Sequence, residues 1–179
     1  MRRMFVCALF VGGLCVSLQA QTLTDAQTVK VKAVLASLQP LGVDPTVVKA
    51  VKSFNAKPPA ELAGMTQDKW DKLNVLDPIV RDLSKNDLAA YLKAKKTPII
   101  IELFVSGANG TKVAFFAKTT SWNHTGKPKH DVPMTGKTWI GAPALDESTG
   151  KLEVQVSFPV LDGAKPIGSI VVGLDVNQL

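Results

Sequence analysis

Apolar residues in the first half of the chain recur at helical spacing. In residues 24–38, Val31, Leu35 and Leu38 lie three or four residues apart, which places them on one face of a helix. Thr24 or Asp25 can cap the start of this helix. Similar stripes, each behind a capping residue, predict four more helices beginning at Asp44-Pro45, near Thr66 or Asp68, at Asp77-Pro78 and at Ser84.

Beyond Pro98 the pattern changes to that of β-strands. Residues 99–105 form a β-branched apolar run long enough for one buried strand. Asn109-Gly110 predicts a hairpin turn, after which residues 112–117 form the partner strand. Residues 118–137 are a polar loop, and residues 138–140 are a short third strand.

The last two strands are the most clearly patterned. Apolar residues from Leu152 to Phe158 alternate with Glu153, Gln155 and Ser157, which predicts a strand with one solvated face. Asp162-Gly163 forms the next turn, and residues 166–176 form the last strand. Since no helix separates these strands, the predicted fold class is α+β, with a five-stranded antiparallel sheet and the N-terminal helices packed against it.

The N-terminus has the order of segments found in a secretory signal peptide. Met1-Arg2-Arg3 is cationic, residues 4–16 are uncharged and apolar, and Ser17 to Ala20 ends in a small residue. The apolar run is shorter than the about 20 residues that span a bilayer, which favours a cleaved signal peptide. An uncleaved anchor is the alternative. We therefore predict a signal peptide at 1–20, an N-terminal helix at 21–43 and a separate domain at 44–179, with secretion to the periplasm.

Composition and charge exclude several classes of protein. With 46% hydrophobic and 20% charged residues the chain is globular, not disordered. Its two cysteines, Cys7 and Cys15, would leave with the signal peptide, which removes disulfide and cysteine-metal chemistry. The net charge of +6 is spread along the chain rather than gathered on one helix, so we expect no nucleic-acid partner.

The two C-terminal strands have the sequence pattern of a known family of domains. The sequence Val154-Gln155-Val156-Ser157-Phe158-Pro159-Val160, then Asp162-Gly163, then Pro166-Ile167-Gly168-Ser169-Ile170-Val171-Val172-Gly173-Leu174 resembles the Cache (PDC) group of extracytoplasmic sensor domains over residues 44–179. The resemblance implies a PAS-like sheet and a non-catalytic role in ligand binding and signal transduction. It also implies a small carboxylate or amino acid as ligand, held between the sheet and the loop after the second strand.

That loop holds most of the candidate binding residues. Residues 118–137 contain four Lys and two His against one Asp, a composition that can hold an anion through charge-assisted hydrogen bonds. We expect a pocket for a small anionic metabolite lined by Trp122, His124, Lys129, His130 and Trp139, with Arg81 and Tyr91 from the helical cover as second candidates. A solvated basic loop is the alternative interpretation.

Two other functions remain open at this point. Because the sequence stops at Leu179, directly after the last strand, we expect the protein to hand its ligand over or to dock on a membrane receptor, and an accessory subunit with an empty pocket is one alternative. A metal-assisted hydrolase using His124, His130 and Asp131 is the other. Their spacing matches no zinc motif and no Gly-x-Ser-x-Gly elbow occurs, so we predict no enzyme, no metal and no cofactor.

Overall fold

The computed structural model describes residues 22–146 and 150–179, so the predicted signal peptide lies outside the described residues. The first helix, α1 (Asp25–Leu38), begins with a capping box. The Thr24 hydroxyl accepts from the Gln27 backbone N–H at 3.2 Å, and the Gln27 side chain accepts from the Thr24 backbone N–H at 3.0 Å. Val31, Leu35 and Leu38 are buried, as the helical spacing predicts.

The second helix, α2 (Pro45–Ala56), follows a short 3₁₀ turn, η1 (Gln39–Val43). The Asp44 carboxylate caps it by accepting from the backbone N–H groups of Thr46 and Val47, and Pro45 occupies the first turn, where no donor is needed. The Tyr91 hydroxyl also donates to Asp44, at 2.7 Å. The predicted start of this helix is confirmed.

Three short helices and one 3₁₀ turn complete the helical half. These are η2 (Ala60–Leu62), α3 (Gln67–Lys72), α4 (Pro78–Lys85) and α5 (Asp87–Lys93). The prediction that Ser84 caps the last helix is wrong, because Ser84 lies inside α4 and its hydroxyl donates to the Arg81 carbonyl. Asn86 caps α5 instead, accepting from the Ala89 N–H at 2.8 Å.

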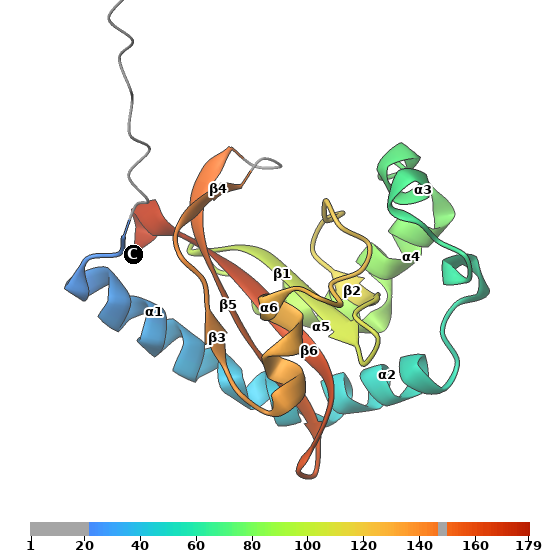
Figure 1. The fold of residues 1–179 in the computed structure, drawn as a ribbon, viewed down its shortest axis with the longest axis horizontal. Coiled ribbons are helices and arrows are strands. Elements are labelled where there is room, and N and C mark those ends of the chain that lie inside the picture. Colours follow the sequence, from blue (N-terminus) through green and yellow to red (C-terminus); the bar gives the residue numbers. More distant parts are fainter. Residues whose placement is uncertain (1–21, 147–149) are drawn as a thin grey trace, which may run out of the picture.

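The second half of the chain forms one antiparallel sheet (Figure 1). Along the sheet the order is β2-β1-β6-β5-β3, with β4 also paired to β5, and every pairing is antiparallel. The predicted fold class is therefore confirmed. The strands are β1 (Ile100–Gly107), β2 (Lys112–Phe115), β3 (Trp139–Ile140), β4 (Ala144–Asp146), β5 (Lys151–Asp162) and β6 (Lys165–Asp175).

One face of the sheet is apolar and packs on the helices. In the ladder, Leu103 of β1, Val172 of β6 and Val156 of β5 lie side by side and are fully buried. In Figure 1, α1 and α2 run along one side of the sheet, while α4 and α5 lie near β2. Gly168 of β6 fits closely against this layer, because a Cβ there would lie 3.0 Å from the Val51 side chain and 2.3 Å from the Ser106 carbonyl oxygen.

The opposite face of the sheet is polar, and residues 116–138, here called the covering segment, lie over it. This segment contains α6 (Pro128–Asp131) and the turn η3 (Pro133–Thr135), so the predicted loop has two short helices, each beginning at a proline. The prediction of a solvated face on β5 is wrong. Glu153 is 6% exposed and Ser157 is fully buried, because the covering segment and the neighbouring strands exclude water from them.

Candidate functional site

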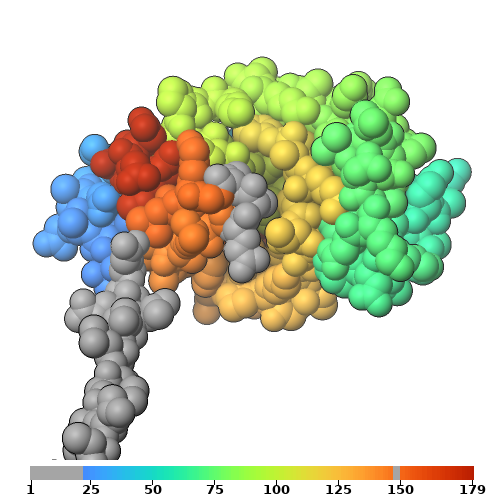
Figure 2. Space-filling view, turned by 90° about the horizontal axis from the view of Figure 1, so that it is seen from above, coloured from blue at the N-terminus to red at the C-terminus, as the bar shows by residue number. Residues whose placement is uncertain are grey.

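A cavity of about 270 Å³ lies between the polar face of the sheet and the covering segment. In Figure 2 the surface dips between the β4–β5 region, in orange, and the residues that follow β2, in yellow. Most of the side chains around it are polar, which suits a small hydrophilic guest. Its lining residues are Glu102, Phe104, Thr119, Thr120, His124, Lys129, Leu145, Asp146, Glu153 and Gln155.

A short chain of hydrogen bonds crosses this cavity from the sheet to the covering segment. The Gln155 side-chain amide donates to the Glu102 carboxylate at 2.8 Å. The Lys129 ammonium donates to the amide oxygen of the same Gln155 at 2.6 Å. Gln155 therefore lies between the acid on β1 and the cation on α6, so the two charges do not pair directly.

Glu153 has an unsatisfied group at this site. Its Oε2 atom is buried and has no hydrogen-bond partner among the described residues. Leaving a buried polar atom without a partner costs free energy, on the order of 1–3 kcal/mol. Such an atom next to a cavity is therefore a candidate contact for a ligand that carries a donor.

The environment of the two glutamates favours their protonated forms. Burial is the largest cause, and with the nearby carboxylates of Glu102 and Asp146 it raises the pKa of Glu153 to about 7, against the weaker influence of Gln155 and Lys129. Burial likewise raises the pKa of Glu102, while Lys129 and Lys112 oppose the rise. The cavity therefore holds two carboxyl groups whose pKa values are raised, and that of Glu153 is close to neutral.

A buried stack of basic side chains lies beside the cavity. The His124 ring stacks on Phe104 with centroids 4.8 Å apart, and the Lys112 Nζ lies 3.7 Å from the Phe104 centroid and contacts His124 Nδ1. Burial lowers the pKa of both groups. The neighbouring lysines lower the pKa of His124 further, whereas Glu102 opposes the fall in the pKa of Lys112. An ammonium on Lys112 that donates to Nδ1 would leave the proton of a neutral His124 on Nε2.

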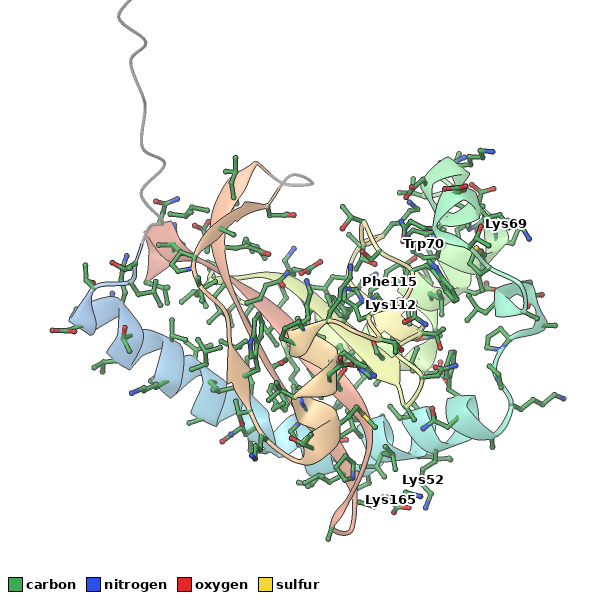
Figure 3. The ribbon with its side chains drawn as sticks, viewed as in Figure 1. Lys52, Lys69, Trp70, Lys112, Phe115 and Lys165 are labelled. Carbon is green, nitrogen blue, oxygen red and sulfur yellow. The ribbon has the colours of Figure 1, made fainter. Side chains whose placement is uncertain are left out.

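Hydrogen bonds fix the covering segment at both ends. The Trp70 indole N–H donates to the Thr119 carbonyl at 2.7 Å, and the His124 backbone N–H donates to the Gly110 carbonyl at 2.9 Å. At the other end, His130 Nδ1 lies 2.8 Å from the Ser169 hydroxyl of β6. Trp70 also packs edge-on against Phe115, and Figure 3 shows the two near Lys112.

The structure brings together two of the seven predicted site residues. His124 and Lys129 line the cavity. His130 is buried beneath α6 against Ser169, and Trp122 lines a separate hollow beside Pro58 and Asn109. The remaining three lie elsewhere: Trp139 on the edge strand β3, Arg81 on the exposed side of α4, and Tyr91 on α5 with its hydroxyl bonded to Asp44.

The acidic half of the site was not predicted from the sequence. Glu102, Glu153 and Gln155 come from β1 and β5, whereas the expected site residues lie in the loop, the short third strand and the helices. The alternation of Glu153, Gln155 and Ser157 with apolar residues was the available signal. The same alternation also fits a solvated face, and only the tertiary fold shows that the covering segment lies over it.

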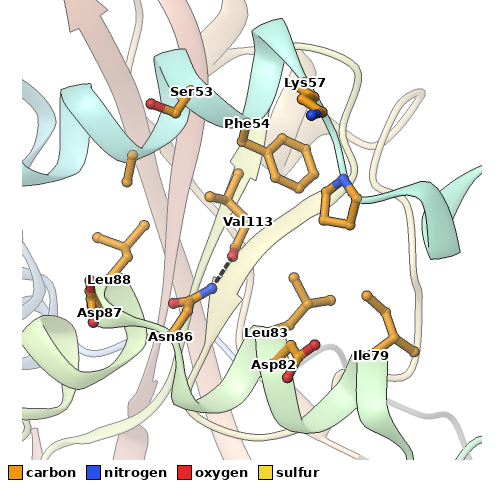
Figure 4. A pocket seen from close by; sticks show the side chains of 12 residues that line it. Ser53, Phe54, Lys57, Ile79, Asp82, Leu83, Asn86, Asp87, Leu88 and Val113 are labelled. Atoms are coloured by element: carbon orange, nitrogen blue, oxygen red, sulfur yellow. Dashed lines mark hydrogen bonds between the residues drawn. The ribbon is translucent and has the colours of Figure 1, made fainter.

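A larger hollow of about 420 Å³ lies on the other side of the sheet, between α2 and the helices α4 and α5 (Figure 4). Its floor is formed by Phe54, Leu83 and Val113, and the Asn86 side chain donates to the Val113 carbonyl at 2.9 Å. Among the described residues, the three buried side-chain atoms without partners belong to Ser106, Glu153 and Ser157, none of which lines this hollow. The smaller cavity is therefore the better candidate site.

No family model matches the sequence, and no curated protein matches it. Among solved structures, the sensor domain of the V. cholerae histidine kinase DctB matches with a TM-score of 0.47 and 17% identity, covering 86% of this chain and 55% of that one. The ligand-binding domain of the Pseudomonas fluorescens chemoreceptor CtaA, in complex with L-isoleucine, has a TM-score of 0.44 and 11% identity. This match covers 86% of this chain and 54% of that one. The ligand-binding domain of the Pseudomonas aeruginosa chemoreceptor PctC, in complex with GABA, has a TM-score of 0.38 and 13% identity. This match covers 83% of this chain and 62% of that one.

These neighbours are the sensor domain of a histidine kinase and the ligand-binding domains of two chemoreceptors. The chain spans between half and two thirds of the length of each. Within residues 22–146 and 150–179, no helix combines the length and apolar character needed to cross a membrane.

Proposed function

We propose that this protein is a non-catalytic, sensor-type module of the Cache kind that binds a small polar metabolite in the cavity beneath the covering segment. The observation that carries the proposal is the buried Glu153 Oε2 atom, which has no hydrogen-bond partner within residues 22–146 and 150–179 and lies beside a cavity of about 270 Å³. A donor on the ligand would satisfy this atom, and the cavity has room for a molecule of amino-acid size.

The charges at the cavity favour an amino acid over a simple carboxylate. Glu102, Asp146 and Glu153 line one cavity, and their negative charges would repel a purely anionic guest. An ammonium group placed between Glu102 and Glu153 would gain charge-assisted hydrogen bonds. The ligand's carboxylate would then face Lys129 and the Nε2–H of His124, which come from the covering segment.

We also propose that the protein acts outside the cytoplasm. The segment 1–20 has the composition of a secretory signal peptide, and sensing of small molecules by Cache-like domains takes place outside the cell membrane. A membrane receptor is the partner that would receive the signal. In this scheme residues 44–179 form the binding domain and α1 is an N-terminal extension packed on it.

A thermal-shift screen tests the proposed ligand class. A compound that binds only the folded state at 100 times its Kd should stabilise the protein by about 2.7 kcal/mol. We expect a rise in Tm with one or more amino acids, and loss of this rise in Glu102→Gln. The matched control is Asp82→Asn, which changes an acid in the hollow on the other face. Stabilisation by dicarboxylates alone would contradict the ammonium site, and a flat response to every compound would favour the accessory subunit.

A further inference from the structure

Gly173 of β6 provides the space in which the two glutamates approach each other. In the ladder it pairs with Glu102 of β1 on one side and with Gln155 of β5 on the other. A Cβ at this position would lie 2.4 Å from Glu153 Oε2 and 3.0 Å from the Glu102 Cβ. Gly173 is not among the glycines with positive φ, so it is the lack of a side chain, and not its backbone conformation, that matters here.

Glu153 reaches sideways over the sheet, away from its direct ladder neighbour, which is also an acid. That neighbour is Asp175, whose carboxylate accepts from Lys151 and from the Asn177 backbone N–H, each at 3.0 Å. The Glu153 carboxyl group instead lies over the β6 backbone at Gly173, toward Glu102. Two acidic side chains from β1 and β5 therefore converge above the strand between them.

The surrounding charged groups leave this acid pair without an ion-pair partner among the described residues. Lys129 of α6 donates to Gln155, and Lys112 of β2 contacts His124 of the covering segment. Asp146 of β4 also lines the cavity and adds negative charge, while Asp175 and Lys151 are paired with each other. Two carboxylates so placed cannot both be ionised without a large cost.

We propose that the Glu102–Glu153 pair, assembled over Gly173, holds one proton when the cavity is empty and releases it to solvent when the ammonium group of a ligand binds. This inference rests on the proposed function and specifies how that site is regulated. The ammonium group then supplies the positive charge that the proton supplied before. The pKa of about 7 for Glu153 in the empty protein agrees with this arrangement.

The exchange makes binding depend on pH in a defined way. If the ligand displaces one proton, its apparent affinity falls about tenfold for each pH unit below the pKa of the pair and levels off above it. A binding site with permanently ionised carboxylates would show no such dependence between pH 5 and 8. Ligand capture would therefore weaken on acidification of the surroundings.

Carbon-13 NMR of the glutamate side chains in the ligand-free protein tests the first half of the proposal. The Glu153 carboxyl signal, assigned with Glu153→Gln, should titrate near pH 7, and Glu102→Gln should lower its midpoint. A midpoint near the ordinary 4.5 in the unmodified protein would overturn the inference, while the proposed binding function would stand on the separate thermal-shift screen.

Methylammonium chloride tests the second half, with tetramethylammonium chloride as the control because it has the charge but no N–H donors. Methylammonium should lower the Glu153 midpoint, and tetramethylammonium should not. A midpoint near 7 that methylammonium leaves unchanged would overturn the exchange. Equal effects of the two salts would overturn it as well, since they would indicate screening rather than binding.

Gly173→Ala tests the role of the glycine. The added methyl group should displace the Glu153 carboxyl, bring its midpoint closer to 4.5 and remove the methylammonium effect. If the variant is too unstable to measure, Glu153→Ala removes the closest atom that the methyl would meet, Glu153 Oε2, and leaves the looser contact with the Glu102 Cβ. Gly173→Ala should then cost much less stability in the Glu153→Ala background than in the unmodified protein. Equal costs in both backgrounds would show that Gly173 serves the backbone alone.

Discussion

Single residues at the cavity and beside it combine burial with ionisable groups whose pKa values burial shifts. Glu153, His124 and Lys112 are each at least nine-tenths buried, and burial is the first cause of the shift in the pKa of every one of them. Core positions of this kind are normally apolar, since burying a charge is costly. Their presence in one place is the residue-scale argument for a binding site, because functional sites are where such groups are retained.

Glu153→Gln should stabilise the empty protein at alkaline pH and change little in acid. The pKa of Glu153 is about 7 in the folded protein against an ordinary 4.5, so the folded state binds the proton more tightly. Its contribution to stability therefore falls as pH rises from about 4.5 to about 7 and is constant above that. The pKa difference corresponds to at most roughly 3 kcal/mol, and glutamine resembles the protonated acid.

Denaturant unfolding of both proteins at pH 4 and pH 8 checks this. We expect nearly equal stability at pH 4 and a more stable variant at pH 8. The comparison isolates Glu153, because the histidines, whose pKa values burial lowers, change the stability of both proteins alike as the pH falls. A variant that is equally destabilised at both pH values would contradict the buried, unpaired glutamate.

At the scale of elements, the covering segment and the helix caps decide which residues reach the site. The covering segment is held by Trp70 of α3 and by Ser169 of β6, so elements from both halves of the chain position it. The caps divide the helical half into its short helices. Two predictions concern these contacts.

Trp70→Phe should loosen the covering segment. The change removes the indole donor to the buried Thr119 carbonyl while it keeps an aromatic ring against Phe115, and it should cost about 1–3 kcal/mol. Hydrogen exchange would report the effect as faster exchange of the His124 amide, which donates to Gly110. Trp139→Phe on β3 is the control and should leave that amide unchanged, and equal exchange in all three proteins would contradict this role of Trp70.

Asn86→Ala and Ser84→Ala should differ clearly in stability. Asn86 accepts from the Ala89 N–H as the cap of α5 and donates to the Val113 carbonyl of β2, so its loss should cost about 1–2 kcal/mol. Ser84 lies inside α4 and its hydroxyl donates to the Arg81 carbonyl of the same helix. Its replacement by alanine keeps the backbone carbonyl that accepts from Lys93, so it should change stability by less than about 0.5 kcal/mol. Thermal unfolding measures both, and the reverse order would restore Ser84 as the cap.

At the scale of the whole molecule, the sheet separates an apolar packing layer from a polar binding layer. Helices α1 and α2 cover one face, and the covering segment covers the other (Figure 1). Strands β1, β5 and β6 contribute to both layers because their side chains alternate between the two faces. The rigid core beneath therefore holds the acid pair in place while the loop-borne cations lie above it.

Export of the whole protein predicts a defined mature chain. Cleavage after Ala20 would remove Arg2 and Arg3 together with Cys7 and Cys15, which leaves a cysteine-free protein. Mass spectrometry of protein from a periplasmic fraction should therefore show a chain that begins at Gln21 and does not react with thiol reagents. An intact chain retained in the membrane fraction would instead support the uncleaved anchor.

Local patterns in the sequence determined the order of elements and the fold class. Capping residues such as Asp44, the helical stripe of α1, the Asn109-Gly110 turn and the alternation in β5 each act over a few residues, so they can be recognised without a structure. The basic residues His124 and Lys129, which line the cavity, lie in the loop that the resemblance to a family indicated.

Only the tertiary structure decided which side of each strand is the binding side and which residues meet there. Glu102 and Glu153 are 51 positions apart in the sequence, and their approach depends on strand β6 passing between them with glycine at position 173. An alternating strand has the same pattern whether its polar face lies in water or under a loop. The covering segment resolves that ambiguity by excluding water from the acids, which is also what changes their pKa values.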